Sequence, residues 1–131
     1  MTVTELTKDI YEKYPKVFSK FLEYLMKNLY DNSLHVNGEK LFLFNYHGEI
    51  YLIPFSMLYG LLEDFFEENR IIITIDYYSN NGTYYRMRLL NKETAMYFGS
   101  WREYRIDGNK SKNKAKYNAI LKACEILERK L

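Results

Sequence analysis

The sequence predicts an α+β fold, and three observations support this prediction. Apolar residues recur at helical spacing in segments near both ends of the chain. Between residues 71 and 90 they alternate instead at strand spacing. From residue 54 onward the predicted order is helix, strand, strand, strand, helix. Because the three strands are consecutive, this order favours an antiparallel meander sheet with the helices on one face, preceded by an N-terminal helical region and a hairpin.

Length and composition predict one domain. The 131 residues match the usual size of a domain, and 47% hydrophobic residues with 18% aromatics suffice for a core. We expect residues 1–53 to form a helical and hairpin extension of an α-β-β-β-α unit over residues 54–131. The single cysteine, Cys124, excludes an internal disulfide, and no apolar run approaches the roughly 18 residues that a membrane span needs. These features predict a cytoplasmic protein that does not enter a membrane.

The N-terminal part predicts two helical segments followed by a hairpin. Thr4 can cap a first short helix, and Pro15 suits the first turn of a second. The second segment carries an apolar stripe, which is typical of a core-facing helix or of a dimer seam and consists of Val17, Phe18, Phe21, Leu22, Leu25 and Leu29. Strands over Leu41–Tyr46 and Glu49–Ile53 then flank a tight turn at His47-Gly48.

A further helix is predicted from Pro54 to Asn69. Its apolar face consists of Leu58, Leu61, Leu62 and Phe65. Its second half is crowded with acidic residues, which are Glu63, Asp64, Glu67 and Glu68. Adjacent carboxylates on one helix are typical of a solvated surface rather than of acid–base chemistry.

The parity of apolar residues predicts the register of the next two strands. In residues 71–78 and 84–90 the odd positions are the more apolar set. Both odd sets share a face only if paired positions sum to an even number. An Asn81-Gly82 turn gives an odd sum, so we expect the three-residue loop Asn80-Asn81-Gly82, with Gly82 in the left-handed conformation.

A third strand and a long helix complete the unit. The strand is predicted within Ala95–Ile106 and contains Trp101, and Gly99 suggests a β-bulge. The helix covers Ser111–Leu131, with Ser111 as its cap. Its buried stripe is expected to consist of Ala115, Ala119, Ile120, Ala123, Cys124, Leu127 and Leu131.

The start of this last helix resembles the double-stranded RNA-binding domain. In that family the last helix opens with a capping Ser or Thr, two basic residues and Ala-Lys, and small residues then recur at every fourth position. Residues 111–116, Ser-Lys-Asn-Lys-Ala-Lys, occupy that place here, followed by Ala119, Ala123 and Leu127. The resemblance covers residues 54–131 and implies a non-enzymatic module that binds double-stranded or structured RNA.

Electrostatics give the same lysines independent weight. Residues 102–131 hold nine Lys and Arg against four Asp and Glu, whereas residues 1–101 hold 10 against 13. A helix N-terminus disfavours each cation by about 0.3–1 kcal/mol, and like charges four residues apart cost about 0.2–0.5 kcal/mol. Cations gathered there indicate an anionic partner such as phosphate, although a solvated helix face is the alternative. The predicted nucleic-acid-binding residues are Lys110, Lys112, Lys114 and Lys116, with Arg86, Arg88 and Arg102 as secondary contributors.

The alternative function is protein–protein interaction. A phage accessory protein or a homodimer would use the helix of residues 15–30 or an uncovered sheet edge. A weaker resemblance, to short proteins of Bacteroidetes phages and mobile elements, lies in the Ser-Lys cap, the Ala-Ile-x-x-Ala helix and the Tyr-, Asn-, Ile- and Lys-rich composition. This resemblance implies a context and no activity.

Enzymatic and metal-binding constellations are not evident in the sequence. His35 and His47 lack a second ligand at metal spacing, and no phosphate-binding glycine loop or nucleophile motif is present. We therefore predict a protein without enzymatic activity, cofactor or metal.

Overall fold

The computed structural model describes residues 2–28, 34–38, 41–79, 83–92, 101–109 and 111–131. For residues 34–35, 77–79, 83–88, 90–92 and 101–109 it describes the backbone alone. These residues form four helices and two three-stranded sheets. The chain is therefore of the α+β class, as predicted.

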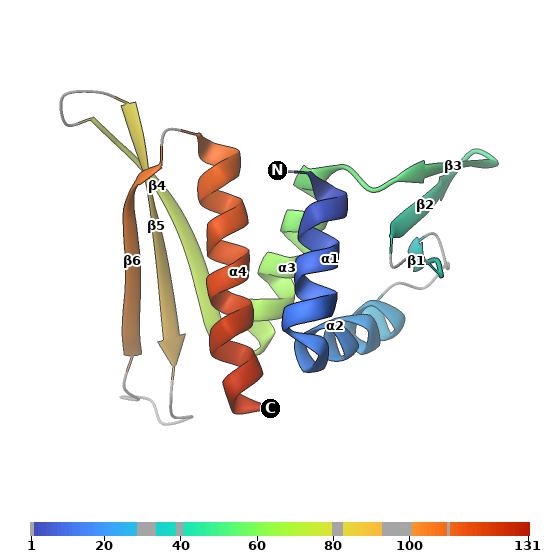
Figure 1. The fold of residues 1–131 in the computed structure, drawn as a ribbon, viewed down its shortest axis with the longest axis horizontal. Helices are drawn as coiled ribbons and strands as arrows, with labels where there is room; N and C mark the ends of the chain where they lie inside the picture. Colours follow the sequence, from blue (N-terminus) through green and yellow to red (C-terminus); the bar gives the residue numbers. More distant parts are fainter. Residues whose placement is uncertain (1, 29–33, 39–40, 80–82, 93–100, 110) are drawn as a thin grey trace.

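The larger sheet is an antiparallel meander of β4 (Ile71–Ser79), β5 (Thr83–Lys92) and β6 (Trp101–Asn109) in that spatial order. Helices α3 (Phe55–Glu68) and α4 (Lys112–Lys130) contact this sheet and lie on one side of it (Figure 1). The observed order of elements confirms the predicted α-β-β-β-α unit. Sequential strands in a meander need only short connections, which suits the short spacing between these segments.

The register of β4 and β5 follows the parity prediction. Ser79 pairs with Thr83, so three residues connect the strands and paired positions sum to an even number. Ile73 pairs with Leu89, and both side chains are buried on the face that the helices cover. The predicted left-handed conformation of Gly82 concerns a residue outside the described part of the chain.

The third strand continues beyond its predicted C-terminal bound, Ile106. It begins at Trp101 and continues to Asn109, whereas residues 95–100, including Gly99 with its predicted bulge, lie outside the described residues. A register irregularity that the sequence did not predict occurs at the far end of the β5–β6 ladder, where Tyr85 pairs with Asn109 and Met87 with Ile106. One extra residue of β6 is accommodated there, as in a β-bulge.

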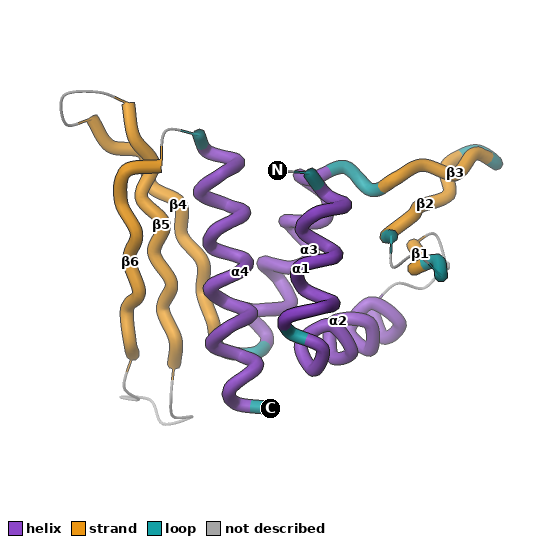
Figure 2. The backbone as a smooth tube through the Cα atoms, in the orientation of Figure 1, coloured by secondary structure: helices purple, strands orange, loops and turns teal. Residues whose placement is uncertain are grey.

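Helix α4 is buried on more sides than its apolar stripe predicted. The expected residues 115, 119, 120, 123, 124 and 127 are buried, but so are Tyr117 and Ile126. Leu131 was expected in the stripe and is instead 39% exposed, because the helix ends at Lys130. The additional burial arises because α4 lies between the β4–β6 sheet and the two N-terminal helices, α1 (Val3–Lys13) and α2 (Pro15–Asn28) (Figure 2).

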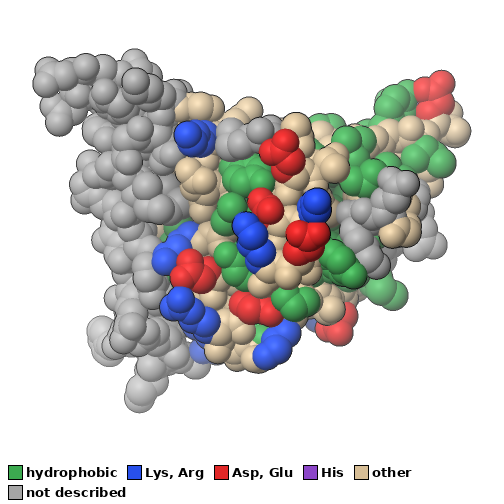
Figure 3. All heavy atoms as spheres, viewed as in Figure 1, with side chains coloured by type: hydrophobic (Ala, Val, Ile, Leu, Met, Phe, Trp, Pro, Cys, Tyr) green, Lys and Arg blue, Asp and Glu red, His purple; other side chains and the backbone are tan. Residues whose placement is uncertain are grey.

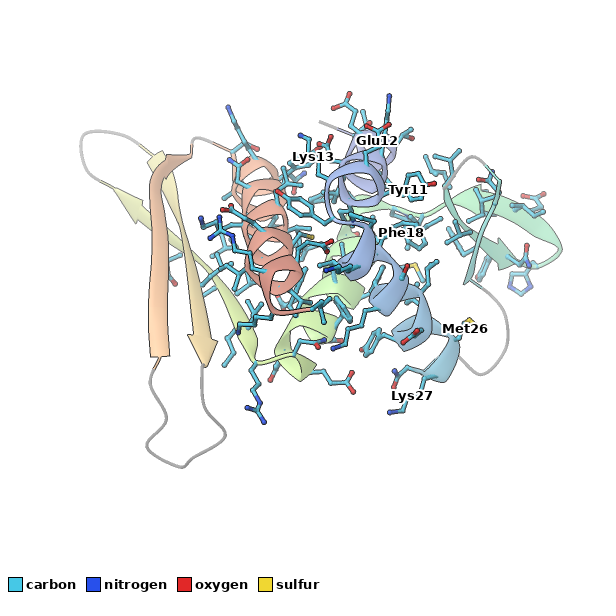
Figure 4. All side chains as sticks on the ribbon, turned by 60° about the horizontal axis from the view of Figure 1, so that its bottom comes forward. Tyr11, Glu12, Lys13, Phe18, Met26 and Lys27 are labelled. Atoms are coloured by element: carbon cyan, nitrogen blue, oxygen red, sulfur yellow. The ribbon has the colours of Figure 1, made fainter. Side chains whose placement is uncertain are left out.

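Helices α1 and α2 complete the core. Thr2, rather than Thr4, caps α1, since its hydroxyl oxygen accepts the Glu5 backbone N–H at 3.1 Å. Tyr11 of α1 packs edge-on against Phe18 of α2, with ring centroids 5.3 Å apart (Figure 4). The predicted stripe of α2 faces inward: Val17, Phe18, Phe21 and Leu25 are buried and Leu22 partly so, whereas Leu29 lies outside the described residues. The stripe therefore belongs to the core rather than to a dimer seam.

Phe21 joins three parts of the molecule. Its ring centroid lies 5.2 Å from that of Phe65 in α3 and 5.6 Å from that of Phe42. Phe42 begins strand β2 (Phe42–Tyr46), so the N-terminal sheet is anchored to the same hydrophobic cluster as the helices. Aromatic pairs at these separations are favourable beyond the area that they bury.

The predicted hairpin is formed by β2 and β3 (Glu49–Leu52). His47 and Gly48 both have positive φ, 48° and 82°, as a two-residue type I′ turn requires. A short strand that the sequence did not predict, β1 (Leu34–Val36), pairs with β2 on the side away from β3. Figure 1 shows the hairpin extending from the helices on the side opposite the β4–β6 sheet.

Candidate nucleic-acid interface

The predicted lysine cluster lies at the N-terminus of α4, and Ser111 caps this helix as expected. Ser111 has an extended backbone, and its Oγ accepts the Lys114 backbone N–H at 3.3 Å. Its carbonyl oxygen accepts the Ala115 N–H at 3.0 Å, which is the first intrahelical bond. The capping serine satisfies one of the N–H groups that a helix start leaves without an intrahelical acceptor.

Lys112 and Lys114 are the exposed members of the cluster. The first turn of α4 contains no acidic residue, and among the described residues neither lysine pairs with a carboxylate. Residues two positions apart on a helix point to different sides, so the two amines flank the helix start rather than converge. Lys110, the remaining member before the helix, lies outside the described residues.

Lys116 has a different environment from its neighbours. It is half-buried, and its Nζ lies 4.7 Å from the centroid of the Tyr59 ring in α3. Tyr59 is itself buried, and burial, followed by a hydrogen bond with Glu63, raises the pKa of its hydroxyl well above the ordinary value. A cation over an aromatic face gains about 0.5–1 kcal/mol at a partly exposed site. Lys116 therefore links the starts of α3 and α4, a role that spacing along α4 alone does not reveal.

The secondary arginines are placed only by the backbone register. Arg86 of β5 stands opposite Asp76, and Arg88 stands opposite Thr74. Arg102 of β6 stands opposite Asn91. Their side chains lie outside the described part of the structure.

The charges over the helices are mixed. Figure 3 shows lysines and arginines interspersed with aspartates and glutamates on the face formed by α1 and α4. In the acidic half of α3, Glu63 is half-buried, whereas Asp64, Glu67 and Glu68 are exposed. The exposed lysine pair at the start of α4 is thus a local feature rather than part of a continuous basic surface on this face.

A concave region occurs at the opposite end of α4, where the sequence predicted nothing. Three adjacent hollows of about 300–550 Å³ share Lys20 of α2 as a lining residue. Glu23, Glu68, Arg70 and Lys130 contribute to their rims, so both signs of charge are present. The spacing of residues along the sequence does not predict such hollows, because they depend on how the ends of three helices pack together.

The described ranges contain neither a metal-binding cluster nor a membrane-crossing helix. No group of three His, Cys, Asp or Glu residues in them is arranged to hold a metal ion. In the same part of the chain, no helix combines the length and apolar character of a membrane-crossing segment. Cys124 is a buried free thiol in α4, and burial raises its pKa.

The comparisons with known proteins add no relative. No family model, curated protein or solved structure matches this chain.

Proposed function

We propose that this protein is a non-enzymatic binding module for double-stranded or otherwise structured RNA, and that the N-terminus of α4 contacts the phosphate backbone. The observation that carries the proposal is the exposure of Lys112 and Lys114 on a first turn without acidic residues. Phosphate oxygens accept hydrogen bonds from both lysine amines and backbone N–H groups, which meet at such a helix start.

Lys112 and Lys114 are the two lysines whose unfavourable interaction with the helix dipole has no compensating contact among the described residues. Lys116 gains an intramolecular partner in Tyr59, which offsets part of its conflict with the helix dipole. Lys112 and Lys114 have no such partner among the described residues, and each is disfavoured there by about 0.3–1 kcal/mol. When a polyanion is bound, its attraction to the two lysines outweighs their repulsion by the helix dipole, so the lysines become stabilising.

The shape of the site favours an extended ligand over a small one. Lys112 and Lys114 stand on an exposed helix end rather than in an enclosed cavity, and phosphates spaced along a nucleic-acid backbone suit such a surface. The resemblance to the double-stranded RNA-binding domain implies that the start of the last helix contacts RNA, whereas Tyr59 and Gly60 stand where that family has the RNA contacts of its first helix. The Lys116–Tyr59 contact holds the start of α4 against α3, which fixes the position of the lysine-bearing helix end. Lys110, Arg86, Arg88 and Arg102 are proposed as additional phosphate contacts, and the reducing cytoplasm as the compartment.

The test is a gel-shift titration with duplex RNA at several salt concentrations. The wild-type affinity should fall steeply with salt, because binding releases counterions from the phosphates. Lys112→Glu combined with Lys114→Glu should abolish the shift and leave the protein folded. A neutral substitution of one phosphate-binding lysine should reduce the salt slope by about one.

A matched control is Lys8→Glu combined with Lys27→Glu. Both residues are exposed lysines on α1 and α2, so this variant changes the net charge by the same amount away from α4. RNA binding should persist in the control. Equal loss of binding in both variants would mean that net charge, and not the start of α4, determines the interaction. A wild-type protein that does not shift RNA at low salt would refute the proposal.

A further inference from the structure

The outer strand of the N-terminal hairpin exposes apolar side chains on both of its faces. Ile50 and Leu52 are 63% and 45% exposed, and Tyr51, on the opposite face, is 42% exposed. A strand that packs one face against a core would bury one of these two sets. Figure 3 shows hydrophobic side chains along the projecting hairpin. This distribution sets β3 apart from strands whose alternate side chains reach the core.

The backbone of β3 is also open on one side. In the sheet order β1-β2-β3 it is an edge strand. In a hairpin with a two-residue turn, alternate pairs exchange the backbone hydrogen bonds, which here are Tyr46–Glu49 and Phe44–Tyr51. The next pair in this alternation is Phe42–Ile53, and the Ile53 N–H does donate to the Phe42 carbonyl at 3.0 Å. The N–H and C=O groups of the intervening residues therefore face the open edge.

The intervening residues are Ile50 and Leu52. Natural sheets usually protect an open edge of this kind from pairing with another strand. Lysine, proline or a bulge within the strand is the common device. The sequence of β3, Glu-Ile-Tyr-Leu, contains none of the three, and its protection is limited to its short length and the charge of Glu49 at one end. The outward backbone groups and the exposed apolar side chains thus occur on the same four residues.

We propose that β3 pairs antiparallel with β3 of a second copy of this chain, around a two-fold axis at Tyr51. Because the outward groups belong to positions 50 and 52, the register that uses all of them pairs Ile50 with Leu52 of the second copy, and Leu52 with its Ile50. Tyr51 then faces its own symmetry mate as a non-hydrogen-bonded pair, in which side chains approach closely. The two sheets become one continuous sheet.

Charge favours the antiparallel arrangement of two copies. Glu49 is the only charged residue of β3, and its carboxylate accepts a hydrogen bond from the Tyr51 hydroxyl. In the antiparallel register the two Glu49 residues lie at opposite ends of the new ladder, each across from Ile53 of the other copy. A parallel pairing would bring the two carboxylates together, and like charges across strands are destabilising. Two copies of the strand therefore avoid repulsion between their carboxylates only when they pair antiparallel.

The size of the contact sets the expected strength. A four-residue edge falls below the roughly 1,200–2,000 Å² of a standard interface, so the dimer should be weak. Sedimentation velocity from roughly 1 to 300 μM should show the sedimentation coefficient rising from the monomer to the dimer value, with half-dissociation in the micromolar range. A concentration-independent monomer over this range would refute the second-copy proposal, whether or not another protein binds the hairpin.

Two substitutions test the edge itself. Ile50→Pro removes an outward N–H without removing a bond to β2, and should weaken dimerisation at least tenfold. Leu52→Lys introduces the usual edge protection and should do the same, which guards against a folding defect in the proline variant. Met26→Lys is the matched control, since Met26 is an exposed apolar residue of α2 and not of the proposed edge strand (Figure 4). Dimerisation unaffected by both edge variants, or weakened equally in the control, would contradict the proposal.

Cysteine cross-linking tests the register. At the two-fold axis the Cα atoms of a non-hydrogen-bonded pair are about 4.5 Å apart, within disulfide range. Tyr51→Cys should therefore give an intermolecular disulfide under mild oxidation, whereas Glu49→Cys and Leu52→Cys should give several-fold less. The native Cys124 is buried and does not compete. Preferential cross-linking at position 50 or 52 would replace the proposed register with another. The proposed dimer uses β3 and not the start of α4, so the Lys112→Glu/Lys114→Glu variant should dimerise normally even though it does not bind RNA.

Discussion

The carboxylate of Glu128, near the end of α4, caps the start of α2 through the backbone of Val17. The Val17 N–H donates to Glu128 Oε2 at 2.9 Å, and the neighbouring Lys16 N–H donates to Oε1 at 3.1 Å. Helix α2 has no acidic residue in its own first turn, and Pro15 supplies no N–H there. A residue more than 100 positions away thus performs the capping that local sequence usually provides.

Loss of this long-range cap should destabilise the protein. Glu128→Ala is expected to lower the free energy of unfolding by about 1–2 kcal/mol, as for other N-cap replacements, measured by urea denaturation at neutral pH. Glu125→Ala is the control, because the ion pairs of Glu125 with other described residues are those with Lys122 and Arg129 on its own helix, which contribute less. Equal effects of the two substitutions would argue against a capping role.

Opposite effects on stability are expected from two lysines on the same face of α4. Lys112→Glu should raise the free energy of unfolding by about 0.5–1 kcal/mol, because it replaces a cation by an anion at a helix N-terminus. Lys116→Glu should lower it, because it removes the contact with the Tyr59 ring and places a carboxylate near Glu63. Thermal denaturation should show a higher melting temperature for Lys112→Glu and a lower one for Lys116→Glu than for the wild type. A stabilised Lys116→Glu protein would show that the ring contact contributes little.

Stability should decline under alkaline conditions. Burial, followed by hydrogen bonds with Glu63 and Asp9, raises the pKa of Tyr59 and of Tyr117 above 10, and burial raises the pKa of the Cys124 thiol above 9. The unfolded chain therefore releases these protons at lower pH than the folded chain. The stabilisation from these groups is complete below about pH 9 and is lost as pH rises further.

The measurement is the free energy of unfolding by urea between pH 7 and 11. Tyr117→Phe also removes the hydroxyl that donates to Asp9 Oδ2 at 2.8 Å, so it should lower the free energy of unfolding by about 1–2 kcal/mol at neutral pH. It should also make the decline of that free energy between pH 9 and 11, the alkaline slope, less steep. Tyr46→Phe, at an exposed position on the hairpin, should change neither quantity. An alkaline slope unaltered by Tyr117→Phe would mean that other groups dominate it.

Arg70 should be replaceable by glycine with a gain in stability. Arg70 follows α3 and has φ of 66°, the left-handed region that residues with a Cβ adopt at a cost. Arg70→Gly is expected to raise the free energy of unfolding by about 0.5–1 kcal/mol, measured by thermal denaturation. Arg70→Ala keeps the Cβ and removes the guanidinium, so it should show no such gain. A gain from alanine equal to that from glycine would place the cost in the side chain rather than in the backbone.

Local patterns were sufficient for much of the fold. The parity of Ile73 and Leu89 predicted the even register and the three-residue connection, because a one-residue slip would move every buried side chain to the other face. The positive φ values of His47 and Gly48 likewise confirm a turn predicted from two residues. These features depend on neighbours along the chain or across one ladder.

The candidate interface was predicted less completely. Exposure of Lys112 and Lys114 agrees with their position on α4, but the partner of Lys116 lies on another helix, and helical spacing carries no information about Tyr59. Strand β1 was not predicted, since its three residues are too few for a period-2 pattern to appear.

The sequence by itself determined the helices, the order of the main strands, the register of β4 against β5, the cap at Ser111 and the gathering of lysines after it. These follow from periodicity, turn chemistry and charge within short windows. Only the tertiary structure decided that α4 is buried on two sides, that Glu128 caps α2, and that Ile50 and Leu52 remain exposed at an open edge. The physical reason is that burial and capping depend on surfaces brought together from distant parts of the chain, whereas backbone propensity is a property of near neighbours.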